Sequence, residues 1–130
     1  MSEALPCYLD TQAAIWLAQG DYDRFCPKIR AIIDAGDLLI SQMAFLEMEY
    51  LFEIGRIHLR ADEVRLVLFA DHGVRLCDLD WAKVTRLALQ EKWTHDPFDR
   101  LIVANAKANG MSTLVSADAR IRENYPKAAW

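Results

Sequence analysis

The chain has 130 residues, of which 53% are hydrophobic and 26% charged, and its formal net charge is −4. These values are typical of a soluble globular protein with its own core and exclude a disordered chain. The negative charge argues against binding nucleic acid by general electrostatic attraction, unless bound cations reverse the charge locally. The three cysteines have no CxxC spacing, so we expect buried thiols rather than a disulfide framework or a zinc site.

The sequence contains no internal repeat, linker or change of composition. We therefore expect one domain that covers residues 1–130. The apolar runs are too short for a membrane span, and no basic segment precedes an apolar one at the N-terminus. From these features we expect a cytoplasmic protein.

Short apolar runs alternate with helical patterns along the chain. The first half predicts a strand at 7–9, a helix over 11–19 that Gly20 ends, a helix over 23–35, a strand at 38–40, and a helix over 43–54 that Ser41 caps. The second half predicts a helix over 62–71, a strand at 74–77, a helix after Asp80, a helix from Asp96-Pro97 to Gly110, a strand at 112–116 and an edge strand in the tail. In the helix after Asp80, Trp81, Val84 and Ala88 share one face and are expected in the core.

Strands separated by helices require crossover connections, which produce a parallel sheet with helices on both faces. We therefore predict an α/β fold, a three-layer α/β/α domain with a central parallel sheet of four to five strands. Sheets of this kind bind ligands outside the carboxyl ends of their strands. The residues that follow the strands are thus the first candidates for a functional site.

Two aspartates follow predicted strands. Asp10 comes directly after the first strand and Asp118 follows the last strong one. If these two strands are neighbours, both carboxylates lie at one edge of the sheet. Each could equally be the N-cap of the next helix, and position alone leaves both alternatives open.

Two further acids share a helix face with apolar residues. Glu47 lies within about 60° of Met43, Tyr50, Leu51 and Ile54 on a helical projection. A carboxylate in the middle of an apolar face is costly unless an arginine or a cation compensates it.

Asp99 shares its face with Ile102, Val103 and Ala106, whereas Asp96 fits the N-cap of the same helix. We expect Asp96 mainly to cap the helix and Asp99 mainly to serve chemistry. The helix dipole favours acids in a first turn, so capping alone could explain both residues.

Four carboxylates at one edge would repel each other unless cations held them. Oxygen ligands with little histidine or cysteine nearby favour Mg²⁺ or Mn²⁺ over zinc. Such a metal can activate water for phosphodiester hydrolysis. Thr11 and Ser116 adjoin the acids and could hydrogen-bond a metal-bound water, or they could be ordinary polar residues at the ends of elements.

The segments "YLDTQAAIWL", "SQMAFLEMEYLFEIGRI", "HDPFDRLIVANA" and "TLVSADARI" together resemble the PIN domain family, in particular the bacterial VapC-type toxins. The likeness covers nearly the whole chain, and its most specific part is "DPFDRLIVANA". Leu46 replaces a frequent Trp and Asn105 a usual Gln, but none of the four acids is missing. The resemblance implies a Mg²⁺- or Mn²⁺-dependent endoribonuclease whose acidic site is Asp10, Glu47, Asp99 and Asp118, with Asp96 as a supporting acid.

The resemblance also implies partners. These are an RNA substrate, a cognate antitoxin protein and a second copy of the chain in a homodimer. Candidate RNA-contacting cations are Lys83, Arg100, Arg120 and Arg122, although each could be an ordinary solvated charge. Two alternatives remain open: a housekeeping RNA-processing nuclease of the same fold, and a non-catalytic α/β interaction module whose acids are caps and ion-pair partners.

Overall fold

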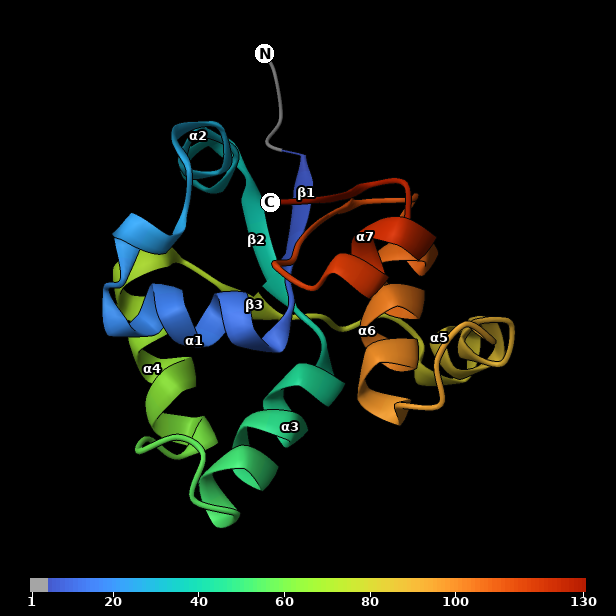
Figure 1. Cartoon of the computed structure of the whole chain (residues 1–130), viewed down its shortest axis with the longest axis horizontal. Coiled ribbons are helices and arrows are strands. Elements are labelled where there is room, and N and C mark those ends of the chain that lie inside the picture. The colour runs from blue at the N-terminus through green and yellow to red at the C-terminus, as the bar shows by residue number, and fades with distance from the viewer. Residues whose placement is uncertain (1–4) are drawn as a thin grey trace.

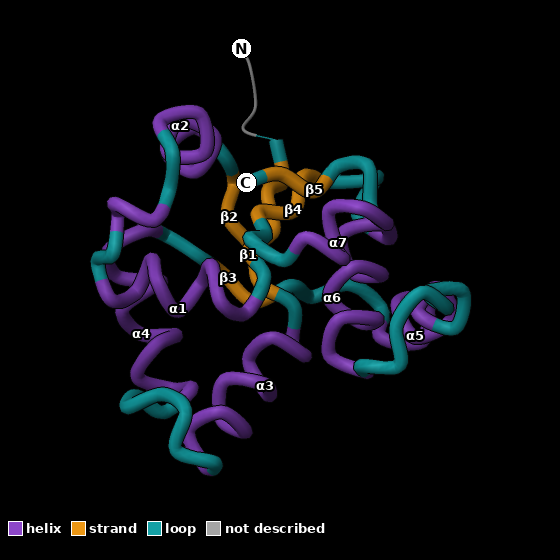
Figure 2. The backbone as a smooth tube through the Cα atoms, in the orientation of Figure 1, coloured by secondary structure: helices purple, strands orange, loops and turns teal. Residues whose placement is uncertain are grey.

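A computed structural model of the chain describes residues 5–130 and contains a five-stranded parallel sheet (Figures 1 and 2). The strands are β1 (Pro6–Leu9), β2 (Asp37–Ile40), β3 (Arg75–Leu76), β4 (Thr113–Val115) and β5 (Ala128–Ala129). Their order across the sheet is β3-β2-β1-β4-β5, and all four neighbouring pairs are parallel. The central strand β1 thus pairs with β2 on one side and β4 on the other.

Within residues 5–130, seven α-helices connect and cover the strands: α1 (Thr11–Gln19), α2 (Pro27–Ala35), α3 (Gln42–Glu53), α4 (Ala61–His72), α5 (Trp81–Ala88), α6 (Pro97–Ala108) and α7 (Ala119–Asn124). Side chains alternate across β1, so Cys7 and Leu9 face one layer and Tyr8 faces the other. One core joins β1 to α1, α2 and α4, and the second joins it to α6 and α7. The predicted three-layer α/β fold is confirmed.

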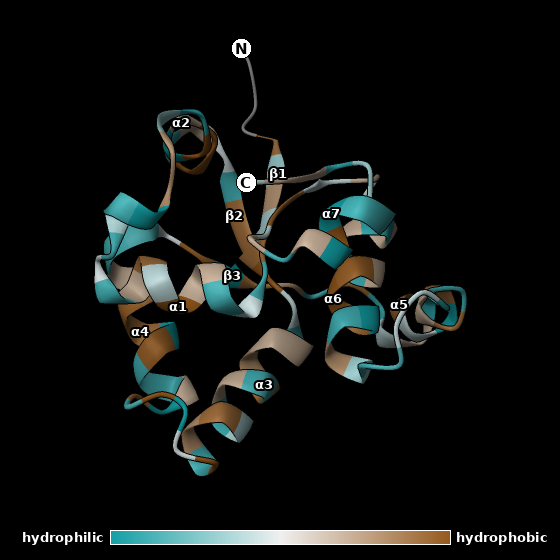
Figure 3. Cartoon of the chain, viewed as in Figure 1, coloured by the Kyte–Doolittle hydropathy of each residue, from teal (hydrophilic) through white to brown (hydrophobic). Residues whose placement is uncertain are grey.

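Helix α3 lies at the edge where the parallel strands end. Its two fully buried residues belong to different cores, since Met48 packs with the α1–α4 side and Ala44 with the α6–α7 side. Helix α5 packs on the outside of α6 through Val84, Ala88 and Ala104. Brown, hydrophobic residues cover most of β2, whereas α6 alternates between brown and teal (Figure 3). A cavity at the carboxyl ends of the strands is lined by residues in or next to α1, α3, α6 and α7.

Three expectations about the packing are wrong. The helix expected over 23–35 is instead a 3₁₀ turn at Tyr22–Arg24 followed by α2, because Pro27 lacks the backbone donor that would continue a helix through it. Trp81 is 43% exposed rather than a core residue, and the Cys26 thiol is exposed.

Over residues 5–130, no helix is both long and hydrophobic enough to cross a membrane.

Candidate active site

Two aspartates stand beyond the carboxyl ends of neighbouring strands. Leu9 of β1 lies opposite Val115 of β4, and the N–H of Asp10 donates to the Val115 carbonyl at 3.1 Å. Asp118 follows β4 after a turn in which its N–H donates to the Ser116 hydroxyl at 3.1 Å. The neighbouring strands that the sequence suggested therefore bring both residues to one edge of the sheet.

Both aspartates also cap helices, so the two alternatives left open by the sequence do not exclude each other. Oδ1 of Asp10 accepts from the Ala13 N–H of α1 at 2.8 Å, and Oδ1 of Asp118 accepts from the Arg120 N–H of α7 at 2.8 Å. Each cap is made by one carboxylate oxygen. Capping holds the carboxyl group in a defined orientation, which favours its use in a site.

Glu47 on α3 points toward the start of α1, next to Asp10. Oε1 of Glu47 accepts a 2.5 Å hydrogen bond from the Thr11 hydroxyl at the start of α1. The helical projection placed Glu47 in the middle of a buried face, but Tyr50 and Ile54 on that face are 47% and 50% exposed. Glu47 is instead half-buried at the boundary of the core, because α3 buries its Ala44 and Met48 side.

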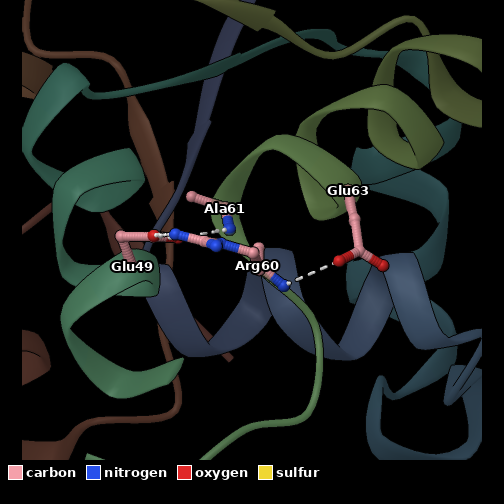
Figure 4. Close-up of polar contacts among 4 residues, drawn as sticks. All are labelled: Glu49, Arg60, Ala61 and Glu63. Atoms are coloured by element: carbon pink, nitrogen blue, oxygen red, sulfur yellow. Dashed lines mark hydrogen bonds and ion pairs between the residues drawn. The ribbon is translucent and has the colours of Figure 1, made fainter. Parts of the chain in front are cut away.

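A clamp between α3 and α4 fixes the rotation of α3 (Figure 4). Glu49, two residues after Glu47, accepts from Nε of Arg60 at 3.2 Å and from the Ala61 N–H, the first residue of α4, at 3.1 Å. Glu63 accepts from the Arg60 N–H at 3.4 Å. Since residues two apart on a helix point to nearly opposite sides, holding Glu49 on α4 directs Glu47 toward α1.

The start of α6 positions the remaining acids. Oδ1 of Asp96 accepts from the N–H groups of Phe98 and Asp99 at 2.8 and 3.3 Å, and the Asp96 N–H donates to the Thr94 hydroxyl at 3.1 Å. Asp96 is thus the N-cap of α6, as expected. Asp99 shares its helix face with the buried Ile102 and Val103, which directs its carboxylate inward.

A cavity of about 370 Å³ contains all four acids of the candidate site. It is lined by Asp10, Thr11, Gln12, Glu47, Leu51, Asp99, Ile102, Ala117, Asp118 and Ile121. Asp96 lies outside this lining. Gln12 is an addition that the strand-end rule could have suggested, because it is the third residue after β1.

The environment of the cavity favours the protonated form of three carboxyl groups. Burial raises the pKa of Asp10 to about 6, and Asp118 adds to the rise, whereas hydrogen bonds from Ser116 and Ala13 oppose it. Burial, then repulsion by Asp96 and Asp118, raises the pKa of Asp99 to about 7. Burial also raises the pKa of Glu47 against the hydrogen bond from Thr11. Among residues 5–130, the cavity lining contains four carboxylates and no lysine or arginine to compensate them.

These pKa values predict how stability depends on pH when no metal is present. Asp10 and Asp99 bind protons more tightly in the folded chain than at their ordinary value of 3.8. Their stabilising effect is therefore complete below about pH 4 and is lost as the pH rises through about 6 and 7. In EDTA, the melting temperature should fall by a few degrees between pH 5 and pH 8. Thermal melts across this range test it, and a steady rise would contradict it.

The donor set is compatible with a hard divalent cation. The polar atoms lining the cavity are mainly carboxylate and hydroxyl oxygens, which Mg²⁺ and Mn²⁺ prefer. Across residues 5–130, no three histidine, cysteine, aspartate or glutamate side chains converge closely enough to hold an ion directly. Mg²⁺ usually keeps several waters and takes one or two carboxylates, so the chemistry of the lining suits such an ion without a tight protein cage.

Comparison with known proteins places the chain in a family. The family model described as the PIN domain matches residues 7–125. The chain belongs to the PIN domain family. No curated protein matches it.

Solved structures with the same fold come from bacterial toxin–antitoxin complexes. A chain of VapBC2 from Rickettsia felis, bound to a DNA fragment from the promoter, is 17% identical, with a TM-score of 0.65 and coverage of 95% of this PIN domain and 96% of that chain. A chain of DNA-bound VapBC from Salmonella typhimurium is 19% identical, with a TM-score of 0.63 and coverage of 95% of this chain and 95% of that chain. A chain of a toxin–antitoxin complex from Klebsiella pneumoniae is 13% identical, with a TM-score of 0.60 and coverage of 95% of this chain and 96% of that chain. At these identities the likeness establishes the fold.

Proposed function

We propose that this PIN domain is a metal-dependent endoribonuclease that hydrolyses phosphodiester bonds in RNA. One observation carries the proposal: four carboxylates from separate parts of the fold line one cavity at the carboxyl ends of the strands. The raised pKa values of Asp10, Glu47 and Asp99 are the expected property of acids gathered to bind a cation. Membership of the PIN domain family supports the same reaction class.

In this proposal Asp10, Glu47, Asp99 and Asp118 would together hold Mg²⁺ or Mn²⁺, directly or through waters that the ion keeps, and Asp96 supports them by orienting the start of α6. The bound metal supplies water activation and neutralises charge on the phosphate. The Thr11 hydroxyl donates to Glu47 and keeps it turned toward α1. The Ser116 hydroxyl donates to the Asp10 carboxylate and helps to orient it. Leu51, Ile102 and Ile121 form apolar walls that limit bulk water beside the carboxylates.

The first experiment compares RNA cleavage by the purified protein in Mg²⁺, in Mn²⁺ and in EDTA. We expect cleavage only with metal, together with a higher melting temperature in metal, because a ligand of the native state stabilises it. An Asp10→Asn protein purified in parallel detects contaminating nuclease. Equal cleavage by both proteins would reveal contamination. No cleavage and no metal-induced stabilisation would favour the non-catalytic interaction module.

We further propose that the chain is the toxin of a toxin–antitoxin pair and forms a homodimer. The fold shared with chains of three toxin–antitoxin complexes supports this role. Helices α3 and α4 also expose large apolar side chains, suited to a protein partner: Leu46, Tyr50, Ile54, Leu66 and Phe69. Growth arrest on expression, relieved by an antitoxin encoded beside the gene, would distinguish a toxin from a housekeeping nuclease.

A further inference from the structure

Charged residues are divided unevenly along the chain. Fourteen acidic and seven basic residues precede Trp81, whereas five acidic and eight basic residues come after it. Three of the five later acids, Asp96, Asp99 and Asp118, belong to the candidate site or its support. The later segment builds α5, α6 and α7, which lie together on one side of the molecule, away from α1, α2 and α4 (Figure 1).

Ion pairing increases this difference. Five of the seven basic residues before Trp81 lie within 4.0 Å of a carboxylate: Arg24, Arg30, Arg60, Arg65 and Arg75. In the described part of the chain after Trp81, only Lys107 has such a partner. We call the following six unpaired residues of α5, α6, α7 and the α5–α6 loop the basic flank: Lys83, Arg86, Lys92, Arg100, Arg120 and Arg122.

Two arginines of the basic flank are anchored to the loop that precedes α6, and each is close in sequence to an acid of the cavity. Arg100 follows Asp99 and donates from Nε to the Thr94 carbonyl at 2.8 Å. Arg120, two residues after Asp118, donates from Nη2 to the adjacent Trp93 carbonyl, and its guanidinium carbon lies 5.9 Å from the centre of the Trp93 ring.

Each of these contacts occupies one part of a guanidinium group, which has five N–H donors. The remaining donors are pre-oriented, so binding a phosphate costs them little conformational entropy.

We propose that RNA binds across the basic flank, with its phosphates following α5, the α5–α6 loop and the start of α7, and enters the cavity beside Arg100 and Arg120. This inference rests on the proposed nuclease function and adds the direction from which the substrate approaches. Residues 11–72, which build α1 to α4, carry ten acidic and six basic residues, and this excess disfavours phosphates on the α1–α4 side. Asp80, the N-cap of α5, is an acid that lies beside Lys83 and Arg86. A protein with a net charge of −4 can thus bind a polyanion on one face.

The test measures equilibrium binding of a fluorescent 2′-O-methyl oligoribonucleotide in EDTA over a range of salt concentrations. This probe and buffer remove cleavage and metal from the readout. Lys83→Gln combined with Arg86→Gln removes two exposed cations of α5 whose side chains form no hydrogen bond or ion pair with residues 5–130. The matched control, Lys28→Gln combined with Arg56→Gln, removes the same charge from exposed positions on α2 and in the α3–α4 connection.

We expect the α5 double variant to bind more weakly and to lose about 1.4 from the slope of log K against log salt, since each single-strand phosphate contact contributes about 0.7. The control should keep the wild-type slope. An equal loss of slope in both variants, or none in either, would overturn the proposal. Salt-dependent binding that is lost only in the α5 variant would support it even if the wild-type protein cleaved no RNA, in which case the nuclease proposal alone would fail.

Discussion

Replacing Asp99 with Asn should lower RNA cleavage on the order of 100-fold or more, because a ligand of the proposed metal contributes several kcal/mol to catalysis. The same substitution should raise the melting temperature of the metal-free protein above pH 7. Asp99 has a pKa of about 7, raised by burial and by the neighbouring Asp96, Asp118, Glu47 and Asp10. A neutral amide relieves that repulsion, so stability and activity should change in opposite directions.

Cleavage rates and thermal melts of Asp99→Asn, with Mg²⁺ and with EDTA, test both halves of this expectation. The matched control is Asp34→Asn, which changes an exposed carboxylate on α2 far from the cavity lining. The control should behave as the wild type. A variant that keeps full activity would remove Asp99 from the site, and a variant that melts lower in EDTA at pH 8 would show that Asp99 is structural.

Replacing Lys107 with Met should destabilise the fold by about 3 kcal/mol, because it leaves a buried carboxylate without its counter-charge. The Glu91 side chain in the α5–α6 loop is 5% exposed, and its Oε1 lies 2.6 Å from Nζ of Lys107 on α6. That oxygen accepts no well-oriented hydrogen bond from the described residues, so the ion pair is its main compensation.

Denaturant unfolding of Lys107→Met, Glu91→Gln and the double variant measures this pair. The double variant should regain most of the lost stability, since neither charge remains buried alone. Lys127→Met, an exposed lysine near the C-terminus, is the control for the loss of one positive charge. Purely additive losses in the double variant would contradict the buried-pair explanation. The loop also supplies the Trp93 and Thr94 carbonyls that hold Arg120 and Arg100, so cleavage by Lys107→Met should decrease as well.

Much of the site could be predicted because it depends on local rules. A carboxylate directly after a strand, as at Asp10, lies at the sheet edge and can cap the next helix, and both properties follow from the neighbouring residues. Asp96 beside Pro97 is a helix start for the same reason. The inward direction of Asp99 follows from the spacing of Ile102 and Val103. That these acids are catalytic stays a prediction.

The sequence by itself determined the parallel α/β order, the helix caps and the positions of the acids relative to the strand ends, because these properties depend on residues within a few positions of each other. Only the tertiary structure decided what covers each face. It exposed Trp81 and Tyr50, joined Glu49 to α4 and buried Glu91 against Lys107. Helical spacing defines which side chains share a face, but burial and ion pairing depend on segments distant in sequence that the fold brings together.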